Sequence, residues 1–375
     1  SGFGAAAISF KEDVETGKNH GVFLNGENNE VKAFLHKQTV QTLKEKGAVN
    51  DRNCVDIDTG AVIFSTDMLK SLYSLIDSQE KYNEMVNDTV RLSLYGDFLY
   101  PLAVDSTLEK YYLEKPEGSF CDELTSARTK VWNALREYRL KLLRLAPAKF
   151  IHFGTTREIL NLMTGGVNKY KDLGWEGKIK SSIANRASGY NSILSNKAVI
   201  GDGCYLEVSY VHRNARVGSG TILSYVDVHD ETIPANVVLH GLKQKNGSFI
   251  ARIYGVLDNP KETKIFGQEF EAVLSSLGIE EQEVWNDGNH TLWNANIYPE
   301  CANIQEAVAS ALEVYNIFST GDKSLVQKWK KQNRKSLCSG FNDADPDAII
   351  AWNKRMQELV LMDEIAKAID NKTPA

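Results

Sequence analysis

The stretch IGDGCYLEVSYVHRNARVGSGTILSYVDVHDETIPAN, residues 200–236, decides the fold. Three turn-like tetrapeptides begin at Ile200, Val217 and Ile233, so they recur at nearly equal intervals. Small apolar residues recur about every five or six positions, at Leu206, Val211, Val217, Ile222, Val228 and Ile233. This is close to a hexapeptide repeat, so we favour a parallel β-helix over three unrelated turns of an antiparallel meander. About three coils bury their inward faces only against neighbours, so they need caps on both sides.

Residues 1–165 have a different pattern and are predicted to form an α/β domain. Short apolar runs typical of strands alternate with segments whose apolar residues recur every three or four positions. The strand-type runs are GVFL (21–24), VKAFL (31–35) and AVIFS (61–65), and the helical segments are TVQTLKEKGAV (39–49), DMLKSLYSLIDS (67–78) and ELTSARTKVWNALREYRLKLLRL (123–145).

Four further segments complete the chain. Residues 166–197 form a connector rich in Gly, Ser, Asn and Lys, and residues 198–247 hold the short β-helix. Residues 248–300 mix strand-type pieces with a helix near 264–277, and residues 301–375 are predicted to be helical.

The C-terminal region carries two informative patterns. Asp345-Pro346 is typical of an N-cap followed by the first residue of a helix. The basic run KWKKQNRK (328–335) is read as a solvated helix face, with an anion or partner site as the alternative. An apolar stripe predicts core packing rather than a cofactor site and consists of Ile349, Trp352, Met356 and Leu359.

Composition argues against several classes of protein. The formal net charge of −6 argues against a nucleic-acid binder, which would normally carry a basic surface. We expect no signal peptide, and no apolar run in this sequence approaches the ~18 residues that a membrane span needs. The five cysteines are far apart and form no C-x-x-C pair, which indicates reduced thiols in the cytoplasm rather than disulfides or a zinc site.

Four stretches carry polar or glycine residues where strands are expected to begin or end. They are NHGVFL (19–24), FLHKQ (34–38), VDIDTGAVIF (55–64) and KFIHFGTTREIL (149–160). The last one reads as a strand containing Phe150 and Ile151, then a glycine turn, then the start of a helix. The candidate residues are His20, Gly21, Lys37, Asp58, Thr59, Gly60, His152, Gly154, Thr155 and Thr156.

Each candidate also has an ordinary structural reading. Lys37 can be a solvated charge, His152 a core histidine, and the GTT of 154–156 an N-cap turn. The DTG of 58–60 matches the aspartic protease motif, but such an enzyme needs two acids that share a proton, and no partner motif occurs. No serine or cysteine triad signature and no H-E-x-x-H metal motif is present.

Together the four stretches indicate an α/β site that binds an anion. Lysine is a compact charge that binds phosphate, and a glycine turn at a helix start directs backbone N–H groups at an anion. Asp and Thr side chains can hydrogen-bond sugar hydroxyls. Sheets of this class place ligands outside the carboxyl ends of their strands, where Lys37 and Gly154 should lie. A phosphorylated sugar fits this set of groups.

The order of several blocks resembles the sugar nucleotidyltransferases, most closely the bacterial L-fucose-1-phosphate guanylyltransferase (GDP-fucose pyrophosphorylase) family. The blocks are HGVF, FLHK, VDIDTGAVIFS, LYGDFLYPL, KFIHFGTTREIL, FIARIYGVLDNPK and TLWNANIYP. The resemblance covers residues 10–300 and is weaker beyond them. It implies a partial Rossmann-like nucleotidyltransferase sheet in residues 1–165, joined to the parallel β-helix and the α-helical C-terminal region.

The resemblance also implies roles for individual residues. Lys37 stands where relatives have the lysine of a Glu-Lys-Pro motif that contacts the sugar phosphate, although Gln38 replaces the proline. Asp58 and Gly60 stand where relatives have a sugar-contacting Asn-x-Gly. His152 occupies the place of a metal-binding aspartate, but Mg²⁺ prefers oxygen ligands, so His152 is expected to contact sugar or phosphate instead. Asp97 is a reserve candidate for the metal, against a capping or solvated role.

The reaction implied by the resemblance joins GTP and β-L-fucose 1-phosphate to give GDP-L-fucose and pyrophosphate, normally with Mg²⁺. The glycine-rich nucleotide loop of the family is not found here, and the chain opens on SGFG without an initiator Met. We therefore expect a fragment that lacks the N-terminal nucleotide-binding segment and is inactive alone. We also expect a cytoplasmic location, self-association that covers a sheet edge, and, as in some relatives, a fused C-terminal fucokinase.

Two other functions are weighed against this one. The first is a non-catalytic sugar-phosphate-binding or assembly module on the same fold. The second is an acyltransferase, because β-helix coils also build those enzymes, and His212, His229 and His240 are available as catalytic histidines.

Overall fold

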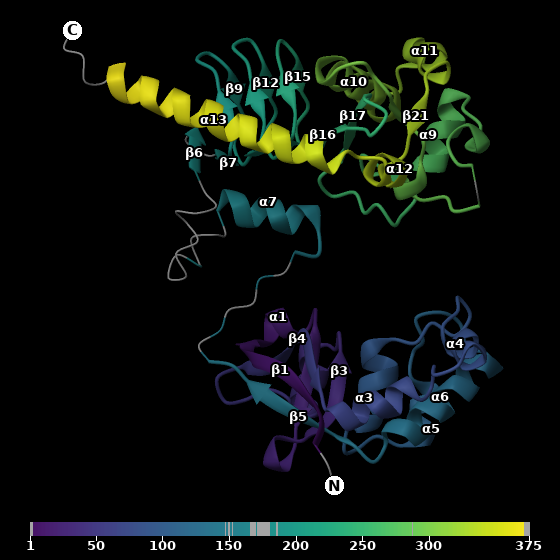
Figure 1. Ribbon diagram of the computed structural model, residues 1–375. Helices are drawn as coiled ribbons and strands as arrows, with labels where there is room; N and C mark the ends of the chain where they lie inside the picture. Colours follow the sequence, from purple (N-terminus) through teal and green to yellow (C-terminus); the bar gives the residue numbers. More distant parts are fainter. Residues whose placement is uncertain are drawn as a thin grey trace. The chain divides into compact units, whose positions relative to one another are not determined.

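The computed structural model describes residues 3–146, 148, 151, 153–165, 170, 181–184, 187–286 and 288–370. The chain splits into two compact units, Ser1–Ile151 and His152–Ala375 (Figure 1). The first domain was expected to extend to residue 165, so the difference concerns helix α7 (Thr156–Thr164). α7 buries Leu160 against Tyr205 and Ile222, and it therefore belongs to the second unit.

The first unit is a mixed five-stranded sheet with helices on both faces. Its strand order is β3-β2-β4-β1-β5, in which β1 runs parallel to β5 and antiparallel to β4. The strands are β1 (Phe3–Asp13), β2 (Gly21–Asn25), β3 (Val31–His36), β4 (Cys54–Phe64) and β5 (Arg139–Arg144). The α-helices are α1 (Val14–Gly17), α2 (Val40–Glu45), α3 (Thr66–Tyr73), α4 (Gln79–Met85), α5 (Leu108–Leu113) and α6 (Asp122–Leu135).

The two faces of this sheet bury separate cores. One face packs on α3 and α6, where Ala7 and Phe23 of the sheet meet Val131 of α6. The other face packs on α2, where Val22 of the sheet meets Leu43. The prediction of an α/β domain is confirmed, with a sheet in which β1 and β5 are the parallel pair.

The predicted long helix 123–145 is wrong in its second half. α6 ends at Leu135, and β5 begins at Arg139. Leu140 and Leu142 are buried beside β1, whereas Leu143 is exposed, so the apolar residues here alternate as in a strand. Of the strand predicted at Phe150 and Ile151, Ile151 lies outside any strand, and Phe150 lies outside the described residues.

The second unit contains the predicted parallel β-helix. Tyr205 of β10 pairs in parallel with Ser188 of the preceding coil and with Ile222 of the following one, and Ile222 pairs in turn with Val238. Two sides of the coils are three-stranded sheets, β8-β11-β14 and β9-β12-β15, and the third side is the sheet β17-β16-β13-β10-β7-β6. The β-helix prediction is therefore confirmed.

The coil strands are β7 (Ala187–Tyr190), β8 (Ile193–Leu194), β9 (Val199–Ile200), β10 (Tyr205–Glu207), β11 (Tyr210–Val211), β12 (Arg216–Val217), β13 (Ile222–Ser224), β14 (Asp227–Val228), β15 (Thr232–Ile233) and β16 (Val237–Lys243). The inward residues Leu206, Val211 and Val228 are fully buried, and Val217 and Ile233 nearly so. Five of the six positions in the sequence pattern therefore face inward. Ile222 does not, because it packs outside the coils against Leu160 of α7, and Leu223 takes the inward place.

Antiparallel strands and helices flank the coils. β6 (Ser181–Ala184) pairs antiparallel with β7, and β17 (Phe249–Gly255) pairs antiparallel with β16. Beyond β17 follow β18 (Lys264–Ile265), β19 (Gln268–Glu269), α9 (Phe270–Leu277), β20 (Tyr298–Pro299), α10 (Ile304–Thr320), α11 (Val326–Lys330), β21 (Arg334–Lys335), α12 (Leu337–Asn342) and α13 (Pro346–Asp370). α9 and α10 share one apolar core with the interior of the coils, so each coil buries its inward face as expected.

Helix α13 runs alongside the β-helix (Figure 1) and confirms the predicted apolar stripe. Met356 is fully buried beside Ile193 and Val208, and the indole N–H of Trp352 donates to the carbonyl of Val208 at 3.0 Å. The Asp345 carboxylate accepts the backbone N–H groups of residues 347 and 348, as an N-cap does. None of the helices in the described part of the chain combines the length and apolar character that crossing a membrane would take.

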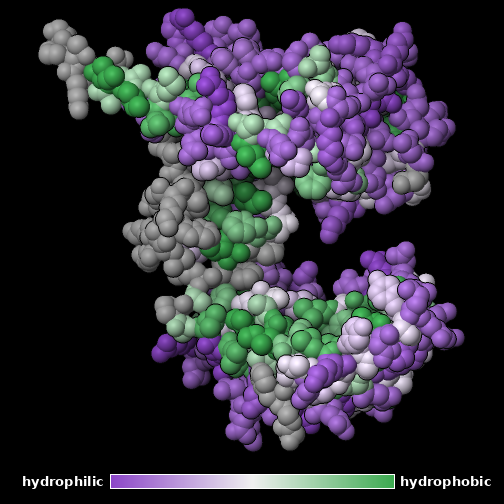
Figure 2. Space-filling model, in the orientation of Figure 1, coloured by the Kyte–Doolittle hydropathy of each residue, from purple (hydrophilic) through white to green (hydrophobic). Residues whose placement is uncertain are grey.

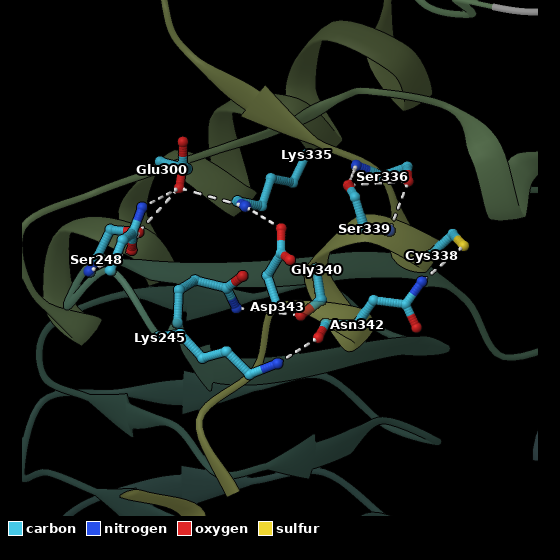
Figure 3. A network of polar contacts seen from close by, with 12 residues as sticks. Lys245, Ser248, Glu300, Lys335, Ser336, Cys338, Ser339, Gly340, Asn342 and Asp343 are labelled. Atoms are coloured by element: carbon cyan, nitrogen blue, oxygen red, sulfur yellow. Dashed lines mark hydrogen bonds and ion pairs between the residues drawn. The ribbon is translucent and has the colours of Figure 1, made fainter.

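The basic run 328–335 is held by ion pairs within the second unit. Lys335 Nζ lies 2.6 Å from Asp343 Oδ2 and 3.7 Å from Glu300 Oε1, and Ser248 Oγ donates to the same Glu300 oxygen (Figure 3). Lys330 similarly pairs with Glu283 at 2.6 Å. Lys330 and Lys335 therefore join separate segments of the unit through ion pairs. This role differs both from a solvated helix face and from an anion or partner site.

The first unit also exposes apolar surface (Figure 2). A groove beside α3 and α4 is lined by Leu69, Tyr73 and Val86, which are exposed by 48%, 65% and 50%. Apolar surface of this kind is more typical of an interaction site than of plain solvent-facing surface.

We predict that Gly218→Ala destabilises the β-helix. A Cβ at Gly218 would lie 2.4 Å from the backbone nitrogen of Ala235 in the next coil, and the coils cannot separate without losing their ladder. Overpacking of this kind costs about 1–3 kcal/mol of unfolding free energy. Urea denaturation followed by circular dichroism measures the loss. Gly288→Ala is the control, because its Cβ would meet no atom within 4 Å. Equal stability of the two variants would contradict this account of the coil packing.

Candidate functional site: a polar cluster on β2, β3 and β4

The DTG sequence forms a bulge in strand β4 that presents the Asp58 carboxylate. The pairing register between β1 and β4 shifts at this point. The Thr59 hydroxyl donates to the carbonyl of Ile8 at 2.8 Å. The backbone N–H of Gly60 donates to Asp58 Oδ1 at 3.1 Å. Gly60 has a φ of +77°, a conformation that residues with a Cβ seldom adopt. Thr59 therefore serves the bulge, and Gly60 allows the turn that holds Asp58.

Gly21 makes room for the side chains around Asp58. A Cβ at this position would lie 2.3 Å from the ring of Phe34 and 3.3 Å from the Cβ of Asp58. Any larger residue would push the Phe34 ring away or displace the carboxylate. Gly21 is thus a packing requirement of the cluster.

Three aromatic rings lie next to the carboxylate. Phe34 and Tyr95 stack with ring centroids 4.8 Å apart and planes 9° apart, and the His36 ring lies 6.4 Å from Tyr95. The Tyr95 hydroxyl hydrogen-bonds Asp58. We call Asp58, Tyr95, His36, Phe34 and Gly21 the Asp58 cluster. It combines a carboxylate, a hydroxyl, an imidazole and apolar ring faces, the groups that recognise the hydroxyls and C–H faces of a sugar.

The electrostatics of the cluster follow from burial. Burial raises the pKa of Asp58, and the hydrogen bonds from Tyr95 and Gly60 offset only part of the rise. Burial and the Asp58 carboxylate both raise the pKa of Tyr95, so its hydroxyl stays protonated as a donor. Burial, and then the charge of Lys37, lower the pKa of His36, while Glu117 and Asp58 act in the opposite direction. At neutral pH His36 is therefore mainly neutral and can both donate and accept a hydrogen bond.

Lys37 lies directly after β3, beside the turn that contains His20. The backbone N–H of Lys37 donates to the carbonyl of His20 at 3.0 Å, and Lys37 adopts a φ of +47°. Its side chain is exposed, and no carboxylate of the described residues forms an ion pair with it. The ammonium group is therefore available to a phosphate next to the Asp58 cluster. The predicted position of Lys37 at a strand end is confirmed, whereas its role stays a prediction.

Asp56 lies two residues from Asp58 on β4, and its pKa is shifted in the opposite direction. Arg144 donates to both of its carboxylate oxygens at 2.7 and 2.9 Å, and Lys11 donates at 2.9 Å. Burial alone would raise the pKa of Asp56, but these hydrogen bonds outweigh it and hold the pKa below its ordinary value. Asp56 is fully paired, and Asp58 is buried without a cation in hydrogen-bonding contact among the described residues.

Asp97 is buried and pairs with an arginine. It is 1% exposed, its Oδ1 accepts Arg128 Nε at 2.8 Å, and its Oδ2 accepts the N–H of Ser93 at 2.7 Å. Arg128 is equally buried and also donates to backbone carbonyls of residues 111, 112 and 114. These contacts favour a structural role for Asp97, because one of its oxygens pairs with a buried arginine and the other accepts a backbone N–H. Its reserve assignment to the metal stays a prediction.

The GTT turn belongs to the second unit. Thr155 is the N-cap of α7 and forms a capping box with Glu158, whose carboxylate accepts the Thr155 backbone N–H at 2.9 Å. Thr156 hydrogen-bonds Tyr254, and Gly154 is exposed before the cap. The ordinary N-cap reading of this turn thus describes its geometry. A contact of Gly154, Thr155 and Thr156 with a sugar phosphate stays a prediction, and His152 lies outside the described residues.

Comparison with known proteins gives the family. Residues 1–303 match the model of the fucose pyrophosphorylase domain. The chain belongs to the fucose pyrophosphorylase domain family. It is 24% identical over 364 residues to a mouse fucose-1-phosphate guanylyltransferase, and 24% identical over 366 residues to the human protein of that name. It is 22% identical over 370 residues to an Arabidopsis thaliana bifunctional fucokinase/GDP-fucose pyrophosphorylase.

The alignments cover much of this fucose pyrophosphorylase domain chain but less of its relatives. They include 82%, 84% and 89% of the chain for the mouse, human and plant proteins, respectively. They include 60%, 59% and 34% of those relatives' own lengths. The chain therefore corresponds to about three fifths of the mouse and human proteins. The family resemblance that the sequence blocks indicated is confirmed.

Sequence reasoning missed three members of the Asp58 cluster. Phe34 and His36 stand two residues apart on β3, so strand alternation places them on one face with Lys37 just beyond. Tyr95 lies in the LYGDFLYPL block, two residues before the Asp97 that was chosen instead. The alternation of side chains along β3 could have identified Phe34 and His36. Only the tertiary structure shows that Tyr95, from the π-helical turn Leu94–Leu99, reaches Asp58.

No set of three close side chains among the described residues consists of the oxygen ligands that suit Mg²⁺. Within them, one set of three His, Cys, Asp or Glu side chains has its ligand atoms close together, and it consists of His212, Asp227 and His229. Two imidazole nitrogens and one carboxylate do not suit Mg²⁺, which prefers oxygen ligands. We therefore assign none of the described residues to Mg²⁺, and this cofactor stays a prediction.

We predict that Asp56→Asn destabilises the protein and that Asp58→Asn does not. At pH 7, Asp56→Asn should lower the unfolding free energy by about 1–3 kcal/mol, because it leaves the partly exposed Arg144 without a charged partner. Asp58→Asn should leave it unchanged or raise it, because it removes a buried charge that lacks a cation. Chemical denaturation of both variants and the parent protein measures the difference.

The difference in unfolding free energy between the Asp56→Asn and Asp58→Asn variants should depend on pH in a definite direction. The depressed pKa of Asp56 contributes stability above its unfolded-state pKa, and that contribution is lost as the pH falls through its folded-state value. The raised pKa of Asp58 gives a cost at neutral pH that is relieved as the pH falls through its folded-state value. The gap between the two variants should therefore shrink on acidification. A gap that is absent at pH 7 would contradict the assignment of charges.

Proposed function

We propose that this chain is the sugar-phosphate-binding part of an enzyme that transfers GMP from GTP to L-fucose 1-phosphate. The products are GDP-L-fucose and pyrophosphate. The family match over residues 1–303 carries the proposal, because it includes the entire first unit with the Asp58 cluster. The names of the mouse and human relatives supply the reaction. The five cysteines are unpaired, which supports a cytoplasmic location.

In this proposal the Asp58 cluster holds the sugar. The Asp58 carboxylate accepts hydrogen bonds from sugar hydroxyls, and a neutral His36 donates or accepts as the next hydroxyl requires. The stacked faces of Phe34 and Tyr95 provide apolar surface for the C–H groups of the ring and the methyl group of a 6-deoxy sugar. The cost of burying Asp58 without a cation is then offset when a ligand supplies hydrogen-bond donors.

Lys37 holds the phosphate in this proposal. Its ammonium group neutralises part of the sugar 1-phosphate charge and leaves one phosphate oxygen directed at the α-phosphorus of GTP. That oxygen forms the new P–O bond in line with the departing pyrophosphate. Catalysis of this kind consists mainly of positioning and charge neutralisation, so residues that fix the sugar phosphate influence the rate directly.

We predict that Lys37→Ala weakens use of the sugar phosphate in the complete gene product. The loss in kcat/KM for L-fucose 1-phosphate should correspond to ~2–4 kcal/mol, the scale of a charge-assisted contact removed from a site. GTP binding should change little. Lys32→Ala is the matched control, because Lys32 is an exposed lysine on the same strand. Unaltered kinetics for the sugar phosphate would remove Lys37 from the site.

The function itself is tested with a panel of sugar 1-phosphates. The complete gene product should release pyrophosphate from GTP with L-fucose 1-phosphate and more slowly with non-deoxy sugar 1-phosphates. Calorimetry on this chain should show binding of L-fucose 1-phosphate that Asp58→Ala abolishes. Binding without turnover in the complete gene product would favour a non-catalytic sugar-phosphate module. No binding and no turnover would overturn the proposal.

A further inference from the structure

Two histidines and an aspartate meet at one side of the β-helix. β11 and β14 pair in parallel, with Val211 opposite Val228, so His212 and His229 occupy equivalent places on adjacent coils. Their rings stack with centroids 3.9 Å apart and planes 14° apart. Asp227, in β14, lies beside both. The register of the coils therefore brings together ligand-type side chains that are far apart along the sequence.

The reactive atoms of these side chains converge. His212 Nε2 lies 2.6 Å from Asp227 Oδ1, and His229 Nε2 lies 3.2 Å from Asp227 Oδ2. All three ligand atoms lie within 4.8 Å of one another. Gln305 of α10 donates to Asp227 Oδ2 at 2.7 Å, which fixes the orientation of the carboxylate. A carboxylate held in this way by an outer hydrogen bond is a usual feature of metal sites.

The exposure of the three side chains leaves one side of the group open. Asp227 is 14% exposed, whereas His212 and His229 are 30% and 43% exposed. Tyr210 covers the far face of His212, with ring centroids 4.0 Å apart. An ion can therefore approach from solvent past His229, and a water molecule can complete its coordination.

The donor set selects the class of ion. Two imidazole nitrogens and one carboxylate oxygen suit Zn²⁺ and similar divalent transition metals, and they suit Mg²⁺ or Ca²⁺ poorly. We propose that His212, Asp227 and His229 bind one such ion, with the remaining position open to water. The ion would tie two coils to each other and, through Gln305, to helix α10. It is independent of the proposed nucleotidyl transfer, whose site is assigned to the first unit.

Ion binding requires a small rearrangement of the rings. Two ligands of a tetrahedral Zn²⁺ at ~2.0–2.1 Å lie about 3.3 Å apart, further than the 2.6 Å between His212 Nε2 and Asp227 Oδ1. The His212 ring must therefore move outward by under about 1 Å to reach that separation. The alternative is a purely structural group in which Asp227 accepts hydrogen bonds from both imidazoles. That group needs no ion, so stoichiometric metal binding separates the two.

Calorimetry with Zn²⁺ tests the site in the intact chain. After dialysis against a chelator, the protein should bind one Zn²⁺ per chain, and binding should raise its melting temperature because only the folded state has the site. His229→Ala and His212→Gln should each weaken Zn²⁺ binding at least about tenfold, the usual effect of losing a ligand or its support. Excess Mg²⁺ should not displace the ion. His290→Gln is the control, because His290 lies outside the group and contacts Glu271 and Glu281.

Two results would overturn the proposal. The first is the lack of one-to-one Zn²⁺ binding by the parent protein, a measurement that does not depend on any variant folding. The second is Zn²⁺ affinity that is equal in the parent, His212→Gln and His229→Ala proteins while circular dichroism shows all three folded. Either outcome would identify the group as a structural hydrogen-bond cluster. Weaker binding in both variants with an unchanged His290→Gln control supports the metal site.

Discussion

The second unit depends on the register with which each coil of the β-helix lies on the next. The nearly constant length of the repeat places like positions above one another, so the inward side chains form one continuous core. The register leaves little space between backbones. A Cβ at Gly201 would lie 2.5 Å from the backbone of Ser219, just as one at Gly218 would meet Ala235. Glycine at these corners is what allows the coils to approach, and the same register sets His212 above His229.

In the first unit the dominant constraint is electrostatic. Asp56 and Asp58 lie two residues apart on β4, and both are nearly inaccessible to solvent. Asp56 is neutralised by Arg144 and Lys11, as a buried charge normally must be. Asp58 instead has the Tyr95 hydroxyl and a backbone N–H. A buried carboxylate with a raised pKa, presented by a bulge in β4 and without a cation beside it among the described residues, is a candidate functional group, which is why the proposed sugar site is centred on it.

Several parts of the fold could be predicted from local pattern. The β-helix, the strands β2 and β3, the N-cap at Asp345 and the core stripe of α13 all follow from spacing along the chain. The helix predicted over 123–145 failed for an identifiable reason. Leu140 and Leu142 continue the apolar pattern of the preceding helix, but their spacing of two residues also fits a strand. Because this segment pairs with β1, it forms strand β5. Helix α7 was assigned to the wrong unit because local sequence does not show which core buries Leu160.

The family, the repeat and the position of Lys37 after a strand could all be read from the amino-acid order, because each is encoded in residues that are close together along the chain. Only the tertiary structure shows which of the buried carboxylates lack a cationic partner within the described part of the chain. Asp58 and Asp97 are both aspartates in polar, glycine-containing stretches, yet the fold gives Asp97 a buried arginine and gives Asp58 a tyrosine. Charge pairing depends on distance in space, and the partner of Asp97 lies 31 residues away along the chain. No local pattern contains that information.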